Sequence, residues 1–168
     1  MNEYLLNRVG QQVAGTLRIR EVWSLKNRDA PEGPRDPGEP PGIAYAVFIG
    51  LPVVDDMSDC GNYVDREYCA GVWLDKSGDP LSVIGLPDMA REPSKIHLLS
   101  RAEAEAVLGD TGQEIVSSTL RYDADLDILL WRIEVSRTLT SGEPHWVDYS
   151  VNAHDGTILG WRDVSVVY

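Results

Sequence analysis

The sequence contains the same series of predicted elements twice, and this repetition limits the folds that it can adopt. Each half has a short amphipathic helix, two strands, and a hairpin around a turn of acidic residues and glycine. The hairpin segments VWLDKSGDPLSVIG and YSVNAHDGTILGW share a pattern in which the turn is offset by one residue. We interpret the repetition as an internal duplication of one α+β unit. Each half has too few strands to bury a sufficient core by itself, so the two helix-plus-antiparallel-sheet units should pack together.

The first unit is predicted over residues 1–90. Its helix has an apolar stripe that ends before Gly15, and its later hairpin turns at residues 76–79. Residues 16–25 alternate like a half-buried strand, and residues 43–54 are apolar enough for a buried central strand. The stripe consists of Leu5, Val9 and Val13, and the buried side of the alternating strand would be Leu17, Ile19, Trp23 and Leu25.

Residues 27–42 interrupt this unit with five prolines and three glycines in sixteen positions. Such a composition cannot form a regular element, so we expect a long surface loop. A proline-rich ligand for a partner's groove is the functional alternative, but the segment has no repeated PxxP register. An exposed connection between strands is therefore the favoured interpretation.

The second unit is predicted over residues 95–168, after a loop at 86–95 that would link the two halves. Ser100 and Glu103 form a capping-box pattern at the start of a short helix. Three or four strands follow, and Asp155-Gly156 is a strong hairpin signal. In the strand ILLWRIEV one face is apolar, formed by Leu129, Trp131, Ile133 and Val135.

The chain is acidic, with 27 acidic against 15 basic residues and a formal net charge of −12. This field repels phosphate backbones and anionic membranes, and it suits solubility, a basic protein partner or cations. No apolar run approaches the length needed to cross a bilayer. The N-terminal residues do not resemble a secretory leader, so a cytoplasmic location is expected, although a secreted form with its leader removed would have the same sequence.

Residues with catalytic potential are few, and we expect no enzyme, cofactor or metal site. His97, His145 and His154 are interpreted as surface or turn residues, because none has a nucleophile and an orienting acid beside it in the sequence. Cys60 and Cys69 either form a disulfide or remain thiols, depending on the compartment. The acidic segment from Asp55 to Glu67 offers carboxylates for a hard cation, but its spacing does not match an EF-hand loop.

Residues 99–161 resemble the PepSY family. The matching pieces are LSRAEAEAVL, ILLWRIEV and WVDYSVNAHDGTILG, which correspond to that family's capped helix, central strand and final hairpin. The resemblance implies a small antiparallel sheet curled around one helix, with the first half of the chain as a degenerate second copy. It also implies a non-catalytic role as an inhibitory or regulatory companion of peptidases and other envelope proteins.

The leading hypothesis is therefore a non-enzymatic protein-binding module of inhibitory or regulatory type. The alternative is a small acidic immunity or antitoxin-type protein that neutralises a basic toxin, and the third hypothesis is a metal-dependent protein that uses residues 55–67. All five tryptophans lie in predicted strands, and most should belong to the core. Trp146, with Asp148 on the same strand face, is the candidate for partner binding, since exposed aromatic residues often anchor interfaces.

Overall fold

A computed structural model of the chain describes residues 2–24, 43–50, 68–109, 113–138 and 144–164. In these ranges the chain forms two helices and eight strands, with a short 3₁₀ helix between the halves. The elements are α1 (Asn2–Ala14), β1 (Arg18–Ser24), β2 (Tyr45–Gly50), β3 (Cys69–Leu74), β4 (Pro80–Ile84), the 3₁₀ helix (Pro93–Ile96), α2 (Arg101–Ala106), β5 (Glu114–Asp123), β6 (Ile128–Thr138), β7 (Pro144–Asn152) and β8 (Ile158–Asp163).

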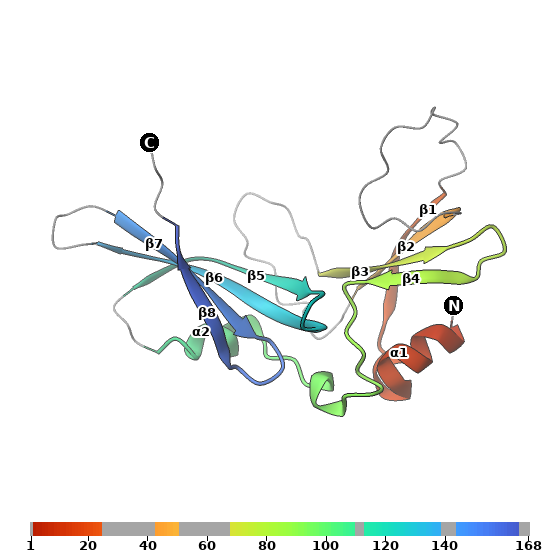
Figure 1. The fold of residues 1–168 in the computed structure, drawn as a ribbon, viewed down its shortest axis with the longest axis horizontal. Helices are drawn as coiled ribbons and strands as arrows, with labels where there is room; N and C mark the ends of the chain where they lie inside the picture. Colours follow the sequence, from red (N-terminus) through yellow and green to blue (C-terminus); the bar gives the residue numbers. More distant parts are fainter. Residues whose placement is uncertain (1, 25–42, 51–67, 110–112, 139–143, 165–168) are drawn as a thin grey trace.

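The strands form two separate antiparallel sheets, so the fold is α+β as expected (Figure 1). The first sheet has the order β1-β2-β3-β4 and follows α1; the second has the order β5-β6-β7-β8 and follows α2. Each unit thus contains a helix, two strands and a closing hairpin. This confirms the repeated series of elements that the sequence indicates.

The two sheets also share their register, including the positions of their bulges. In the first sheet the register shifts between Ile19 and Glu21, and in the second it shifts between Ile115 and Ser117, at the same place in each first strand. A second shift lies beside the turn of each closing hairpin, at Trp73/Leu74 and at Ser150/Val151. Because bulges are positional features of a sheet rather than random defects, their coincidence supports an internal duplication.

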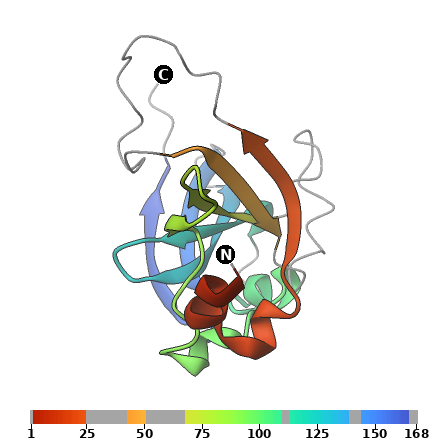
Figure 2. The ribbon, with the colours of Figure 1, turned by 90° about the vertical axis from the view of Figure 1, so that its right-hand side faces the viewer.

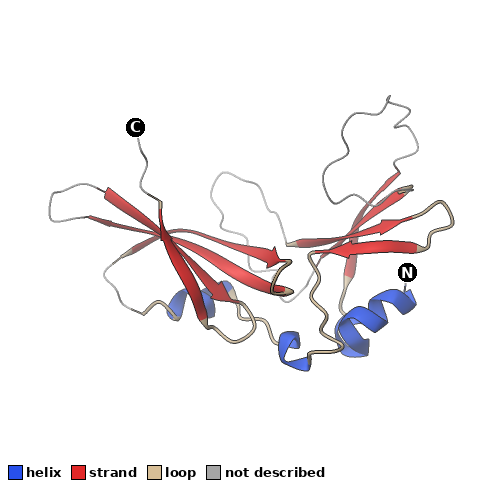
Figure 3. Ribbon diagram, in the orientation of Figure 1, coloured by secondary structure: helices blue, strands red, loops and turns tan. Residues whose placement is uncertain are grey.

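The helices lie on one side of the two sheets (Figure 3). Viewed from the end of the molecule, α1 lies below the first sheet (Figure 2). Its predicted apolar stripe is buried, with Leu5 at 7%, Val9 at 0% and Val13 at 9% exposure. The helix is kinked at Gly10, whose φ of 77° is outside the helical range.

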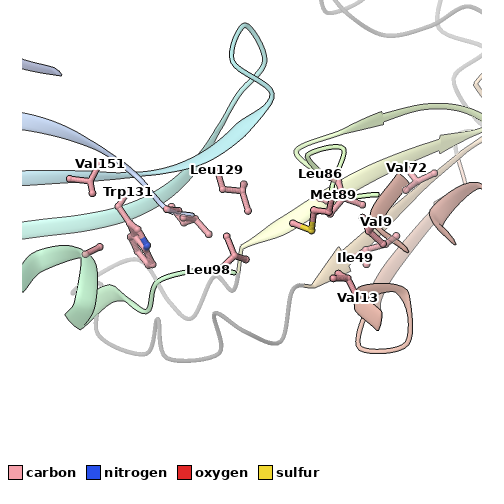
Figure 4. Packing of buried hydrophobic residues seen from close by; sticks show 14 of the residues in the cluster. Val9, Val13, Ile49, Val72, Leu86, Met89, Leu98, Leu129, Trp131 and Val151 are labelled. Carbon is pink, nitrogen blue, oxygen red and sulfur yellow. The ribbon is translucent and has the colours of Figure 1, made fainter. Parts of the chain in front are cut away.

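One hydrophobic cluster runs through both units (Figure 4). In the second sheet it contains the whole predicted apolar face of β6: Leu129, Trp131, Ile133 and Val135, all at 2% exposure or less. The segment at 86–95, expected as a loop that links the two halves, contributes to the same core through Leu86 and Met89, at 0% and 1% exposure. Residues 90–94 of the segment are exposed, and it packs into the core on either side of them, at Leu86 and Met89 and at the buried Lys95.

The short helix α2 is fixed to the second sheet by polar contacts at both ends. The predicted capping box is present: the Ser100 hydroxyl accepts from the Glu103 amide, and the Glu103 carboxylate accepts from the Ser100 amide. Glu105 accepts from the buried Ser118 hydroxyl of β5 at 2.6 Å. Before the helix, the indole N–H of Trp131 donates to the Leu99 carbonyl at 3.0 Å.

The expectation that residues 16–25 form a half-buried strand is wrong in its burial, because the strand that forms there, β1, is exposed. All seven of its residues are exposed, including Ile19, Val22 and Trp23 at 55–58% exposure. Two causes are visible: β1 is an edge strand, and its bulge breaks the alternation on which the prediction depended. The Trp23 ring packs edge-on against Phe48, with ring centroids 5.0 Å apart.

The prediction that most tryptophans belong to the core is also wrong. Trp131 is fully buried, Trp73 and Trp146 are half-buried, and Trp23 and Trp161 are exposed. The two exposed rings both lie in edge strands, which have a neighbouring strand on only one side among the residues that the structure describes. A strand pattern predicts alternation, but it does not indicate which strands are at the edge of a sheet.

Candidate functional site

A hollow of about 420 Å³ lies on the outer face of the second sheet, opposite the face that carries Trp131. Its walls come from the central strands β6 and β7, the edge strand β8 and the β5–β6 turn. The described residues that line it are Asp123, Leu126, Leu130, Arg132, Asp148, Ser150, Leu159, Gly160, Trp161 and Arg162.

Asp148 holds two arginines in this hollow. Its Oδ2 accepts from Nε of Arg132 at 3.0 Å, from Nε of Arg162 at 2.9 Å and from Nη2 of Arg132, and it forms an ion pair with Nη2 of Arg162 at 2.9 Å. The Asp148 side chain is only 4% exposed, whereas the side chains of Arg132 and Arg162 are 33% and 64% exposed. The carboxylate therefore lies inside and the guanidinium groups of the arginine pair, Arg132 and Arg162, face solvent.

The register of the sheet brings these three residues together. Asp148 is the direct cross-strand partner of Arg162 on β8, and Arg132 on β6 pairs with Ser150, two residues farther along β7. Arg132 therefore reaches Asp148 diagonally, a distance that a long side chain can span. The alternation of ILLWRIEV places Arg132 on the polar face, so its exposure could be predicted, but its pairing with Asp148 depends on the register.

Apolar residues complete the hollow along its edge. Trp161 is 67% exposed, Leu126 54% and Leu159 42%. All six residues of β8 are exposed, and β8 is an outer strand of the sheet with no strand on its far side within the described ranges. An edge of this kind presents unpaired backbone N–H and C=O groups that can pair with an added strand.

Asp123, the other carboxylate in the hollow, is engaged by its own turn. Its Oδ1 accepts from the backbone amides of Asp125 and Leu126, both at 3.0 Å. These bonds hold Leu126 at the rim of the hollow and occupy one lobe of the carboxylate. The exposed polar groups of the hollow are consequently dominated by the arginine pair.

Of the two residues proposed for partner binding, the structure places only Asp148 in the hollow. Trp146 lies two residues earlier on β7, half-buried and paired with Ser136. Sequence reasoning missed Trp161 and the arginine pair. The signal that could have found Trp161 is the weak apolar alternation of TILGW, which is typical of an edge strand rather than a buried one.

A second polar cluster joins the two units at the β5–β6 turn. Asp127 accepts from Nη2 of Arg8 at 2.7 Å, from the Tyr122 hydroxyl at 2.6 Å and from the Asp88 amide at 2.9 Å. The ammonium group of the buried Lys95 lies 3.3 Å from the same carboxylate. One aspartate thus contacts α1, the connecting segment and the second sheet.

The electrostatics of this cluster favour an ionised Asp127. Burial alone would raise the pKa of Asp127, but the hydrogen bonds from Tyr122 and the Asp88 amide and the charge of Arg8 outweigh it, so the pKa lies below its ordinary value. Burial, together with the hydrogen bond to Asp127 and the carboxylate's charge, raises the pKa of Tyr122 to about 12. A phenol held neutral in this way acts as a donor to the carboxylate, which suits a structural role.

His154 lies in a turn as expected, but it is not a surface residue. It is 6% exposed, its Nε2 accepts from the Leu129 amide at 3.1 Å, and its Nδ1 lies 3.1 Å from the His97 carbonyl. The carbonyl requires a proton on Nδ1 and the amide requires a lone pair on Nε2, so both bonds are satisfied by the neutral ring. Burial lowers the pKa of His154, although the bond to the His97 carbonyl opposes this.

The other residues singled out in the sequence give no further site. His145 lies 3.3 Å from the carboxylate of Asp163 on the neighbouring strand. The acidic segment 55–67, the loop at 27–42 and Cys60 lie outside the described residues. Within the described ranges no group of three or more metal-ligating side chains occurs, and no helix is long and apolar enough to cross a membrane.

Comparisons with known proteins identify no relative. No family model matches the chain, and neither a curated protein nor a solved structure is detectably similar to it.

Proposed function

We propose that this chain is a non-enzymatic protein-binding module of inhibitory or regulatory type that binds its partner along β8 and the hollow beside it. The observation that carries the proposal is Trp161, a tryptophan 67% exposed in an edge strand and next to a hollow that contains two arginines. Tryptophan and arginine are the residue types most enriched at the energetic centres of protein interfaces.

The edge of β8 offers a specific mode of binding. An extended segment of a partner can hydrogen-bond to the free backbone groups of an edge strand and place alternate side chains into neighbouring pockets. Natural edge strands usually carry proline, lysine or inward-pointing charges that prevent such pairing. The sequence of β8, ILGWRD, has no proline or lysine and exposes Ile158, Leu159 and Trp161.

The resemblance of residues 99–161 to the PepSY family supports the same type of function. The described second unit has the order that the resemblance implies, a capped helix followed by antiparallel strands and a final hairpin.

The proposal can be tested by purifying the tagged chain from its native host alongside two variants. Trp161→Ala removes the exposed ring of β8, and Trp23→Ala removes the exposed ring of β1, 55% exposed, as the matched control. We expect one stoichiometric protein with the wild type and the control, and its loss with Trp161→Ala at unchanged thermal stability. Absence of any stoichiometric protein, or equal capture by both variants, would contradict the proposal.

A toxin-neutralising role is the alternative form of this function, and the net charge of −12 favours it. A basic toxin would be attracted over long range, so its association rate should fall steeply with added salt. If the purified partner is neutral or acidic, or its association rate is insensitive to salt, the toxin-neutralising form is wrong.

A further inference from the structure

We propose that the arginine pair receives the carboxylate of a glutamate or aspartate side chain from an extended partner segment that lies along β8. This inference rests on the proposed function and adds the chemistry that selects the partner. It follows from how the two guanidinium groups are held, from what the duplicated unit has at the same positions, and from the charge of the whole chain.

The guanidinium donors of the two arginines converge on one carboxylate. Both arginines use Nε and Nη2 to contact a single oxygen of Asp148. A guanidinium has five N–H donors, so Nη1 of each group is left over, and the described residues provide no acceptor for it. Asp148 keeps the two groups side by side. The arginine side chains are therefore already ordered and lose less conformational entropy when a ligand binds.

Charges of both signs lie around the arginine pair. One carboxylate faces two guanidinium groups, and that carboxylate is buried while its partners are exposed. Two other acids are close: Asp123 is bound by turn amides, and Glu134, opposite Asp148 on β6, is half-buried and is not among the residues that line the hollow. Among the charged residues that line the hollow, the two arginines are balanced by Asp123 and Asp148, and Arg162 is the most exposed of the four.

The first sheet has uncharged residues at the positions of the three charged ones. The shared register places Ala46, Gly71 and Ile84 of the first sheet where the second sheet has Arg132, Asp148 and Arg162. The first sheet has the same strand order and the same bulges without any of the three charges. The charged triad is consequently not needed to build this type of sheet, and a buried ion pair is weak evidence for stability alone.

Among anions, a carboxylate side chain suits this hollow best. A polyanion such as nucleic acid would be repelled by a net charge of −12, whereas a single carboxylate meets mainly the local field. Peptide C-termini are typically captured by nests of backbone amides, and the described donors in this hollow are guanidinium side chains. Leu159, which lines the hollow beside the pair, fits an apolar residue next to the acidic one, whereas the register places Trp161 opposite Tyr149, one position away from the row of Asp148 and Arg162.

The experiment is a selection of random peptides, displayed with both ends fused, against the full chain. The fusion removes free C-terminal carboxylates, so only side-chain acids can be selected. We expect enriched peptides with a glutamate or aspartate near an aromatic or aliphatic residue. Replacing that acid by its amide, or using Arg162→Gln, should weaken binding about tenfold or more. Inorganic phosphate at the same concentration should not displace the peptide.

The control is Arg121→Gln on the same sheet. Arg121 is exposed and does not line the hollow, so its loss should leave binding unchanged. Peptides without an enriched acid, or equal binding to Arg162→Gln and wild type, would overturn the inference while leaving the proposed function intact. Displacement by phosphate would indicate a general anion site and would also overturn it. A loss of binding in both Arg162→Gln and Arg121→Gln, or a selection that yields no peptide, would count against the inference. The comparison of Trp161→Ala with wild type would then decide the proposed function independently.

Discussion

The hydroxyl of Tyr122 donates to the carboxylate of Asp127 at 2.6 Å, across the turn that joins β5 to β6. The same carboxylate accepts from Arg8 of α1, so this turn of the second unit is anchored to the first helix of the chain. Asp127 has a φ of 50°, a left-handed conformation that is uncommon outside glycine. The contacts of its side chain hold the turn in that conformation and join the two units.

Replacing Asp127 by asparagine should destabilise the protein by about 1–3 kcal/mol. Asparagine tolerates the left-handed conformation, so the change isolates the lost charge. The buried Lys95 would lose one of its two carboxylate partners and keep only Glu92, at 3.1 Å. Urea unfolding measures the effect, with Asp125→Asn, an exposed aspartate of the same turn, as the control. Equal stability of the two variants would contradict the role assigned to Asp127.

Acid should weaken the same contact. The pKa of Asp127 lies below its ordinary value of 3.8 in the folded protein, so its contribution is complete above pH 3.8 and is lost as the pH falls through the folded value. Stability curves of wild type and Asp127→Asn should therefore converge as the solution is acidified below that point. A constant difference between the two proteins down to the lowest pH measured would show that the carboxylate is not linked to folding.

Ionisation of Tyr122 should lower the free energy of unfolding at alkaline pH. Its pKa is raised from 10.0 to about 12, so the unfolded chain releases the proton first, and the contribution present below pH 10 is lost as the pH rises toward 12. Tyr122→Phe should cost about 1 kcal/mol at neutral pH and remove this component of the alkaline loss. The measurement is urea unfolding from pH 8 upward, within the range in which both proteins refold. Parallel profiles of wild type and variant would disprove the linkage.

His154 should make the fold sensitive to mild acid. Because burial lowers its pKa below 6.5, the unfolded chain binds the proton more readily, and stability should decline as the pH falls from about 6.5. The proton would also displace the bond from the Leu129 amide to Nε2. An NMR titration of the ring should give a midpoint below 6.5, and His154→Gln should reduce the decline. His145→Gln is the control; a midpoint at or above 6.5 for His154 would contradict the expectation.

The elements of this fold could be predicted from the sequence because local physical chemistry determines them. Ser100 and Glu103 form the predicted capping box, and the four apolar residues of β6 are all buried on one face. The hairpin turns follow from side chains that bond their own backbone, such as Asp75, whose Oδ1 accepts from the amides of Ser77 and Asp79. These features depend on residues within a few positions of one another.

The features that the sequence did not predict depend on contacts between residues far apart in the chain. Trp161 and Trp146 have similar strand patterns, yet only Trp161 lies in an edge strand, and edge position depends on the order of strands in the sheet. His154 is buried because Leu129 and His97, 25 and 57 residues away, bind its ring. The arginine pair likewise depends on a register that links β6, β7 and β8. None of these contacts leaves a periodic signal in the sequence.

Two glycines at the two ends of β4 have the same backbone conformation, but their replacement by alanine should destabilise the protein to different extents. Gly78 and Gly85 both have positive φ, at 85° and 82°, so alanine is strained at either position. A Cβ at Gly78 would meet nothing within 4 Å, whereas one at Gly85 would lie 2.6 Å from the Tyr68 hydroxyl, which donates to the Gly85 carbonyl. Gly78→Ala should therefore cost about 1 kcal/mol, and Gly85→Ala about 1–3 kcal/mol more.

The Tyr68→Phe background separates the clash from the backbone strain. Without the hydroxyl, the closest remaining atoms to the added Cβ at Gly85 are 3.5 Å away, an ordinary contact distance. Gly85→Ala should then cost little more than Gly78→Ala, giving a coupling between Tyr68 and Gly85 in a double-mutant cycle followed by urea unfolding. If the extra cost of Gly85→Ala persists in full in the Tyr68→Phe background, the hydroxyl is not its cause, and the close packing of the chain at the end of β4 has to be explained by the backbone alone.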